Sequence, residues 1–306
     1  MHHVTDAMID AAVTPADAQA VLRDALQRLG QGEAAMQERI RTEAGGVKLS
    51  TLGAVIPGQH VAGAKVYTTI AGQFNFVILL FSTEDGRPLA SFDAGAITRL
   101  RTAACSTIAA RHLARPDARH LGLLGCGVQG QAHARQLSSA FGLRRIRVFD
   151  PHVAPGVLAA LQQDCGVTVE HCATAEAAID GADIVVTASR ATEPLFHGDR
   201  LPVGCFVAAI GSSLPHTREL DDTALRRASL IAIEWKQQTL REAGDLVRAA
   251  PDALLPEGKV VELADLVTGR VAGRQGDDEI TLYKSVGIGL QDVALAGLAW
   301  SRLALA

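Results

Sequence analysis

The chain has few aromatic residues, few cysteines and no long hydrophobic run. Its 306 residues include 4% aromatic residues and five cysteines, which are odd in number and show no CxxC spacing. This pattern excludes a disulfide framework and a zinc site built from cysteine pairs, and no metal is expected. A run of roughly 20 apolar residues, as needed to span a bilayer, is absent, and so is a signal-peptide pattern. We therefore expect a cytoplasmic protein with reduced thiols and no membrane partner.

A strong excess of charge of either sign is also absent. The formal net charge of −4 argues against nucleic acid as the main partner. The basic cluster Arg144, Arg145 and Arg147 is expected to be solvated surface. Hydrophobic residues make up 48% of the chain, and its length is sufficient for two domains with separate cores. These properties indicate a soluble globular enzyme whose partner is a small molecule.

A glycine-rich motif in the middle of the chain is its most informative feature. Residues 121–124 predict a short buried strand, and Gly125 and Gly127 allow a tight turn that comes close to a pyrophosphate. Gly130 removes the side chain where the following helix must pack against that strand. The first amides of this helix would face a phosphate group. The motif therefore predicts a dinucleotide-binding turn.

The acidic residue after the next strand indicates which dinucleotide is bound. Residues 145–149 predict a strand, and Asp150 follows it where the ribose of the cofactor would lie. A carboxylate accepts hydrogen bonds from the ribose hydroxyls and repels a 2′-phosphate. Pro151 and His152 follow Asp150 where an arginine would favour the phosphate. We therefore expect NAD(H), with NADP(H) less favoured. A tight turn without a ligand is the alternative.

The pattern of strands and helices divides the chain into two domains. From residue 119 onward strands and helices alternate, which is typical of a parallel sheet covered by helices. The preceding residues predict a smaller α+β domain, to which a last helix over 286–303 is expected to return. The predicted strands of this α+β domain cover residues 49–56, 61–70, 74–81 and 89–92. The predicted fold class is thus α/β, with a doubly wound Rossmann-type domain at 116–286 and the α+β domain at 1–115 and 287–306.

Further cofactor contacts are expected at the ends of two later strands. Ligands of open α/β sheets lie beyond the carboxyl ends of their strands. The segment 187–189 and Gly211 end two such strands, so both are expected to face the cofactor, with loop capping as the alternative. The cofactor-binding residues predicted from these patterns are Gly125, Gly127, Val128, Gln129, Gly130, Asp150, Thr187, Ala188, Ser189 and Gly211.

Three cationic residues of the first domain also stand out. Lys65 lies within an apolar strand, Arg101 lies in an alanine-rich helix, and Arg39 precedes both. Each of them is also compatible with a surface charge whose stem covers apolar residues. These patterns alone indicate a dehydrogenase or reductase of unknown substrate.

The order of several motifs resembles the ornithine cyclodeaminase and mu-crystallin family over nearly the whole chain. The motifs are Gln37-Glu-Arg39, Gly63-Ala-Lys65, Ile97-Thr-Arg-Leu-Arg101-Thr-Ala-Ala104, the turn at Gly125, Ala209-Ile-Gly211 through Pro215 to Arg218-Glu-Leu220, and Leu282-Tyr-Lys-Ser-Val-Gly287 with Asp292. The resemblance implies a nicotinamide cofactor and a substrate with a carboxylate beside an amine or imine carbon. It also implies a homodimer in which first-domain strands of two subunits pack together, so the first domain would serve substrate binding and dimerisation.

The same resemblance implies roles for particular residues. Arg39, Lys65 and Arg101 would hold the substrate carboxylate, because two or three cations fix its orientation. The segment Ser285, Val286 and Gly287 would line the edge of the nicotinamide ring.

Two departures from the family pattern favour its ketimine reductase and mu-crystallin branch. Family members that cyclise ornithine resemble one another in an aspartate where Ser213 stands here, and a serine hydroxyl cannot replace its acid–base chemistry near neutral pH. They also carry a glutamate shortly after a Gly-Val step, whereas Gly46-Val47 is followed here by Lys48. The candidate catalytic residues are Lys65, Ser213 and His216. His216 could donate or relay a proton, although a lone loop histidine is more often plain surface.

The sequence thus predicts an NADH-dependent reductase of cyclic imino acids such as Δ1-pyrroline-2-carboxylate or Δ1-piperideine-2-carboxylate. The alternatives of the same class are an ornithine cyclodeaminase and an alanine-type dehydrogenase. A crystallin-like protein that binds NAD(P)H and a ligand with little turnover is the alternative of another class. Methyl transfer from S-adenosylmethionine also uses a glycine-rich turn, but it would leave the three cations unexplained.

Overall fold

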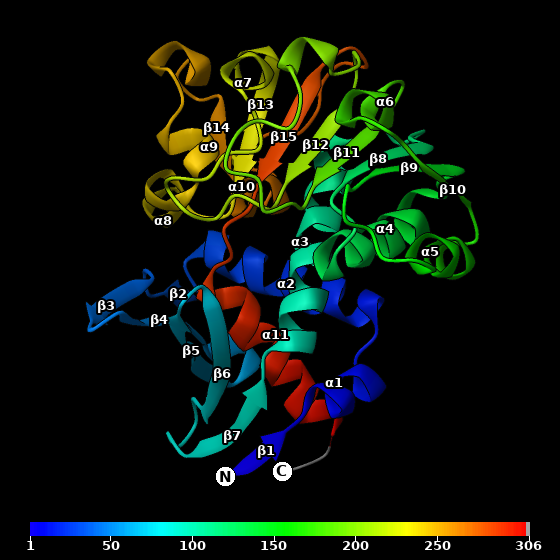
Figure 1. Cartoon of the computed structure of the whole chain (residues 1–306). Coiled ribbons are helices and arrows are strands. Elements are labelled where there is room, and N and C mark those ends of the chain that lie inside the picture. Colours follow the sequence, from blue (N-terminus) through cyan, green and yellow to red (C-terminus); the bar gives the residue numbers. More distant parts are fainter. Residues whose placement is uncertain (304–306) are drawn as a thin grey trace. The chain divides into compact units, whose positions relative to one another are not determined.

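The computed structural model describes residues 1–303, and the chain forms two compact units. Unit 1 comprises residues 1–105 and the chain from Gly287 onward, and unit 2 comprises residues 106–286. The first boundary lies inside helix α3 (Gly95–Leu113), and the second lies between Val286 and Gly287. Residues 304–306 of the domain expected at 287–306 lie outside the described residues. Each unit has its own sheet (Figure 1).

Unit 1 is built on a mixed seven-stranded sheet with the order β1-β7-β6-β5-β4-β2, in which β3 also pairs with β4. In this sheet β1 and β7 are parallel, whereas the other neighbours are antiparallel. The long strands pair in register from Val47 opposite Ile70 to Ile56 opposite Val61. The strands are β1 (His2–Val4), β2 (Ala35–Met36), β3 (Ile40–Ala44), β4 (Val47–Ile56), β5 (Val61–Ile70), β6 (Gln73–Ser82) and β7 (Pro88–Asp93).

The helices of unit 1 are α1 (Asp6–Ala12), α2 (Pro15–Gln31), the first part of α3, and α11 (Gly289–Arg302). Helix α2 starts at Thr14, which forms a reciprocal capping box with Asp17, and ends at Gly32 in the left-handed conformation. Helix α11 packs against α2, β4 and β5. Its first residue must be glycine, because a Cβ atom at Gly289 would lie 2.5 Å from the carbonyl oxygen of Gly53.

Unit 2 contains an eight-stranded sheet with the order β10-β9-β8-β11-β12-β15-β13-β14. All of its neighbours are parallel, which confirms the predicted Rossmann-type sheet. The chain builds outward from β8 to β10 and then crosses back to β11, so a topological switch point lies between β8 and β11. The strands are β8 (His120–Leu124), β9 (Arg145–Phe149), β10 (Thr168–His171), β11 (Ile184–Thr187), β12 (Phe206–Ala209), β13 (Ala228–Ile233), β14 (Val260–Glu262) and β15 (Ile280–Lys284).

The helices of unit 2 connect these strands. After the end of α3 they are α4 (Val128–Phe141), α5 (Val157–Cys165), α6 (Ala175–Ile179), α7 (Asp222–Arg227), α8 (Lys236–Glu242), α9 (Gly244–Val247) and α10 (Leu263–Val267). Across the described residues, none of the helices combines the length and the apolar character needed to cross a membrane.

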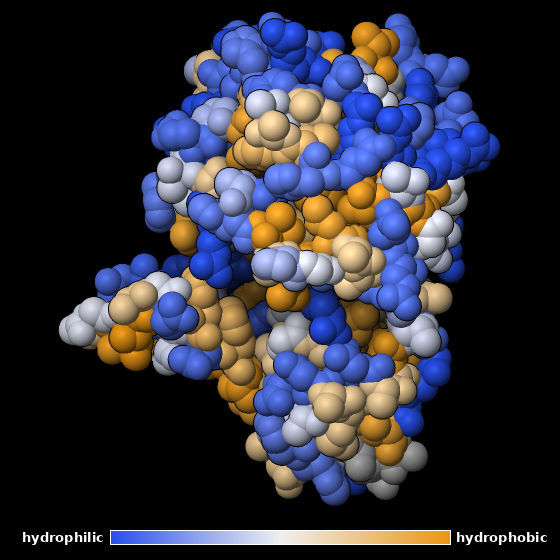
Figure 2. Space-filling view, turned by 45° about the vertical axis from the view of Figure 1, so that its right-hand side comes forward, coloured by the Kyte–Doolittle hydropathy of each residue, from blue (hydrophilic) through white to orange (hydrophobic). Residues whose placement is uncertain are grey.

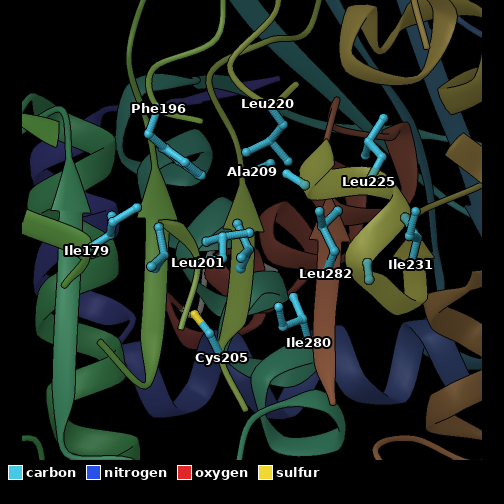
Figure 3. Close-up of a cluster of buried hydrophobic side chains, with 14 of the residues drawn as sticks. Ile179, Phe196, Leu201, Cys205, Ala209, Leu220, Leu225, Ile231, Ile280 and Leu282 are labelled. Carbon is cyan, nitrogen blue, oxygen red and sulfur yellow. The ribbon is translucent and has the colours of Figure 1, made fainter. Parts of the chain in front are cut away.

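The core of unit 2 is formed by apolar side chains from neighbouring strands. Figure 3 shows Ala209, Leu282 and Ile231 on the strands, with Leu220 and Leu225 from the segment around α7 packed over them. All five are fully buried. This packing fixes the carboxyl ends of β11, β12 and β15, from which the candidate site is built.

Strand β15 occupies a central position between β12 and β13, although no strand was predicted there. Its sequence has polar residues at two of five positions, Thr281 and Lys284, and both are fully buried. The Thr281 hydroxyl donates to the carbonyl oxygen of Leu113, and Lys284 pairs with Asp245. Buried polar residues with partners break the apolar run that marks a parallel strand, so the pattern could not reveal it.

Candidate active site

The glycine turn (residues 125–130) has the backbone geometry that a bound phosphate requires. Gly125 has φ +95, and a Cβ atom there would lie 2.6 Å from the carbonyl oxygen of Ala188. A Cβ atom at Gly130 would lie 2.0 Å from the carbonyl oxygen of Gly125, so α4 can pack closely against the turn. Gly127 instead faces open space, because a Cβ atom there would have no neighbouring heavy atom within 4 Å. The turn therefore leaves its approach side clear for a ligand.

A cavity of about 480 Å³ lies beside this turn, wholly within unit 2. Five of the predicted cofactor-binding residues line it. Its other lining residues are the last residues of β8 and β9 and residues that follow β9 and β11. The lining residues are Leu124, Gly125, Gly127, Phe149, Asp150, Pro151, His152, Ala188, Ser189, Arg190, Ala191 and Leu195. We call it the cofactor cavity. Val128 and Gln129 lie within the glycine turn and are the first residues of α4.

Asp150 is held in a fixed orientation at the edge of the cofactor cavity. Its Oδ2 accepts a hydrogen bond of 2.8 Å from the amide of Cys126, and its Oδ1 accepts one of 2.8 Å from the amide of His152. Each carboxylate oxygen has a second lone pair that remains able to accept a hydroxyl proton. The carboxylate is therefore preorganised as an acceptor for a ribose diol.

A buried carboxylate that the sequence did not single out organises the ends of β11 and β12. The fully buried Glu219 accepts hydrogen bonds at Oε1 from the amide and the hydroxyl of Ser189, at 2.8 and 2.6 Å. Its Oε2 accepts from the Thr187 hydroxyl at 2.8 Å and from the amides of Gly211 and Ser212 at 2.7 and 3.3 Å. Thr187 and Gly211 thus face Glu219, and neither lines the cofactor cavity.

A second buried carboxylate holds the segment before the unit boundary. Glu234 accepts hydrogen bonds from the Ser285 hydroxyl at 2.8 Å and from the amide of Val286 at 2.7 Å. Ser285 and Val286 are both buried. The next residue, Gly287, belongs to unit 1. Glu219 and Glu234 are single acidic residues in short segments, and only the three-dimensional arrangement of donors around them reveals their role.

A buried ion pair connects β15 to the segment that contains Glu219. Lys284 Nζ lies 2.9 Å from Asp245 Oδ2 and donates to the carbonyl oxygen of Ala209 at 3.2 Å. Asp245 Oδ1 accepts hydrogen bonds from the amides of Glu219 and Leu220 at 2.7 and 2.9 Å. The pair therefore fixes the backbone of Glu219 as well as the end of β15.

The predicted catalytic residues Ser213 and His216 lie in a compact turn of unit 2. The Ser212 hydroxyl donates to the carbonyl oxygen of Thr217 at 2.7 Å, which closes the turn around both residues. A Cβ atom at Gly244 would lie 1.9 Å from the same carbonyl oxygen, so the turn packs closely on α9. Ser213 is half-buried and His216 is exposed.

The structure brings the three predicted carboxylate-binding cations together in unit 1. Lys65 Nζ donates to the Thr98 hydroxyl oxygen at 2.6 Å and lies 3.4 Å from Asp292 Oδ1. Arg101 Nε lies 3.4 Å from the same carboxylate oxygen. Arg39 donates to the carbonyl oxygen of Gly287 at 2.8 Å. We call Arg39, Lys65, Arg101 and Asp292 the cationic centre.

The environment of Lys65 weakens its hold on a proton. Burial lowers its pKa from 10.5 to about 8, and the positive charges of Arg101 and Arg39 act in the same direction. Asp292 opposes this shift. The ring of Phe76 lies on one side of the ammonium group, with Nζ 4.6 Å from the ring centroid. The cationic centre holds three cations and one carboxylate, so its charge is of the sign that a substrate anion would neutralise.

The fold and both sites define a protein with a Rossmann-type dinucleotide-binding sheet and a separate mixed-sheet unit that carries a cationic centre. The model of the ornithine cyclodeaminase/mu-crystallin family matches residues 1–304. The chain belongs to this family.

Three relatives illustrate the similarity. The Delta(1)-pyrroline-2-carboxylate reductase of Bacillus cereus is 31% identical over 258 residues, which cover 81% of this chain and 79% of the relative. A probable ornithine cyclodeaminase from Bordetella pertussis Tohama I has a solved structure with 62% identity and a TM-score of 0.96, covering 99% of this chain and 97% of its own. The Delta(1)-pyrroline-2-carboxylate reductase of Thermococcus litoralis, solved with NADH and L-proline, has 25% identity and a TM-score of 0.93, covering 99% and 98%.

Proposed function

We propose that the protein is an NADH-dependent reductase of cyclic imino acids such as Δ1-pyrroline-2-carboxylate or Δ1-piperideine-2-carboxylate. The observation that carries this proposal is the cationic centre, which gathers three cations beside one buried carboxylate. Relatives named Delta(1)-pyrroline-2-carboxylate reductase support it. Ser213, in place of the aspartate expected of a cyclodeaminase, favours the reductase as well.

In this proposal the cationic centre binds the carboxylate of the substrate. Lys65 and Arg101 share one carboxylate oxygen of Asp292, so their charges are only partly neutralised. A buried carboxylate that pairs with both cations gains charge-assisted hydrogen bonds and a fixed orientation. The ring of Phe76 against Lys65 places an apolar surface beside this anchor, which suits a cyclic carbon skeleton.

The cofactor cavity fits a nicotinamide dinucleotide. The open space over Gly127 leaves room for phosphate, and the anchored carboxylate of Asp150 is suited to the ribose diol. The bound cofactor supplies the hydride that reduces the C=N bond. Glu219 and Glu234 shape the surrounding strand ends and take no part in the chemistry themselves.

The imine nitrogen needs one proton during the reduction, and Lys65 is the group best suited to hold it. A pKa of about 8 leaves its ammonium group mostly protonated at neutral pH and still able to release the proton. His216 is the second candidate, since it lies exposed in the turn that follows Ser213.

We further propose that the protein forms a homodimer through the sheet of unit 1. Several large apolar side chains on β3 to β6 are exposed, and apolar colour is visible on the projecting strands at the left of Figure 2. The strand register places six of these side chains on one face of the sheet, and Phe74 and Phe76 on the other face, which carries Lys65. A sheet face with several exposed apolar side chains is uncommon on a monomer. The exposed side chains are Ile40, Val47, Leu49, Val55, Ile70, Phe74, Phe76 and Phe81. Light scattering should give the mass of a dimer, and a monomer at micromolar concentration would contradict it.

Ornithine cyclodeaminase is the second candidate, because the relative from Bordetella pertussis with 62% identity is described as a probable ornithine cyclodeaminase. A panel of substrates with the purified protein separates the two. We expect loss of NADH absorbance with the cyclic imino acids and little ammonia from NAD⁺ with ornithine. Ammonia and proline formed from ornithine at the higher rate would overturn the proposal. Tight NADH binding without turnover of any imino acid would instead favour a binding role.

A further inference from the structure

An arginine that the sequence did not single out lines the cofactor cavity. Arg190 lies in the turn that follows β11, on the same cavity as Gly125 and Asp150. Its side chain is exposed, and it forms no ion pair with any of the described residues. Other exposed arginines of unit 2 pair with a neighbouring carboxylate, as Arg226 does with Asp252 and Arg270 does with Asp265.

The turn that carries Arg190 is anchored on both sides. Ser189 donates its amide and its hydroxyl to the buried carboxylate of Glu219, at 2.8 and 2.6 Å. The amide of Ala191 in turn donates to the Ser189 hydroxyl oxygen at 3.1 Å. The Cα atom of Arg190 is therefore set by a rigid turn, which limits the directions in which its side chain can extend. A solvated surface arginine requires no such support.

The other walls of the cavity indicate which part of a cofactor would meet this side chain. Phe149, Leu195 and the alanines around Arg190 form apolar walls, whereas Asp150 offers a carboxylate. A ribose bound at Asp150 places the attached base among the apolar walls. The negative charge of Asp150 disfavours a phosphate on that ribose.

We propose that the guanidinium group of Arg190 covers the adenine ring of the bound cofactor. Guanidinium groups are planar and weakly hydrated, so they stack well on aromatic rings. The proposal rests on the proposed binding of NADH and adds a residue that positions the adenosine half. Arg190 contributes affinity through its flat surface rather than through its charge alone.

Equilibrium binding tests this proposal without any turnover. The wild type, Arg190→Ala, Arg190→Lys and the control Arg200→Ala are titrated with NADH and NADPH by nicotinamide fluorescence, and ADP-ribose is measured by displacement of NADH. Arg200 is an exposed arginine of unit 2 outside the cofactor cavity. Thermal unfolding of each variant checks that the fold is retained.

We expect Arg190→Ala to weaken NADH, NADPH and ADP-ribose by the same factor, about two- to fivefold, as for an exposed cation–π contact. Arg190→Lys should restore little of this loss, because an ammonium group keeps the charge without the plane. Arg200→Ala should bind like the wild type.

Three results would overturn the proposal. Unchanged NADH affinity in Arg190→Ala would show that the side chain is only solvated. A loss confined to NADPH would place Arg190 at the 2′-phosphate, and full rescue by lysine would identify a contact with the pyrophosphate. Failure of the wild type itself to bind NADH would refute the proposed function as well. That result is distinguishable from the other three, because none of the four proteins would then bind NADH.

Discussion

Replacing Glu219 by glutamine should loosen the strand ends that carry the cofactor cavity. Glu219 accepts five hydrogen bonds, two at Oε1 and three at Oε2. A glutamine keeps one oxygen, and its NH₂ group is a donor that cannot face another N–H group. The least costly arrangement places the NH₂ group at the Oε1 position, where the Ser189 hydroxyl can turn to accept while the Ser189 amide loses its partner.

The magnitude follows from the partners that are lost or weakened. A buried amide left without an acceptor costs about 1–3 kcal/mol, and each bond that changes from a charged to a neutral acceptor loses about 1 kcal/mol. Removal of a buried charge offsets part of this loss. We expect a net destabilisation of about 3 kcal/mol for local opening of the segment 187–212.

Hydrogen exchange measured by mass spectrometry gives this local free energy. Amides of the segment 187–212 should exchange faster by about two orders of magnitude, whereas β5 in unit 1 should be unchanged. Glu193→Gln is the matched control, because the Glu193 side chain is 71% exposed and pairs with Arg248 at the surface. If the amides of this segment exchange as slowly in Glu219→Gln as in Glu193→Gln, the proposed organising role of Glu219 is wrong.

Further predictions concern the cationic centre and the cofactor cavity. Arg101→Ala should cost about 2–5 kcal/mol of substrate interaction, seen as a loss in kcat/KM, since it removes one partner of a desolvated carboxylate. If Arg101→Ala lowers kcat/KM no more than the surface variant Arg99→Ala does, Arg101 does not bind the substrate carboxylate. Asp150→Ala should raise KM for NADH and relax the discrimination against NADPH. An unchanged ratio of the KM values for NADH and NADPH would show that Asp150 does not contact the ribose. The lowered pKa of Lys65 means that the unfolded chain holds this proton up to a higher pH than the folded protein does, so folding stability should rise with pH between about 8 and 10.5. In the same range KM for the imino acid should rise as the ammonium charge is lost, and a Lys65→Met variant that keeps both pH dependences would refute this assignment.

The sequence predicted the elements whose residues alternate or repeat in a regular way. Strand β5 was predicted at its observed bounds, 61–70, because apolar and β-branched residues on both sides of Lys65 continue up to the turn at Ala71-Gly72. The Rossmann-type motif was equally clear, since Gly125 and Gly130 are required by close contacts that only glycine permits. Local chemistry therefore determined these parts of the fold.

The remaining parts depend on contacts between distant segments. The clustering of Lys65 and Arg101 around Asp292 arises because α11 packs on the sheet 227 residues after Lys65, and no local pattern encodes that distance. Glu219 acquires its role from donors at the ends of two strands, Thr187 in β11 and Gly211 just after β12. In both cases the sequence shows the residue type, but the contacts that determine its role form only when distant segments come together on folding.

The most direct test of the proposed function is to follow the transferred hydrogen. The purified protein is incubated with Δ1-pyrroline-2-carboxylate and NADH that carries deuterium at the transferring position of the nicotinamide ring, and the product is analysed by mass spectrometry and NMR. The proposal predicts proline with one deuterium on the carbon beside the carboxylate. Proline without deuterium, or no proline from the imino acid while ornithine is converted to proline with release of ammonia, would contradict it.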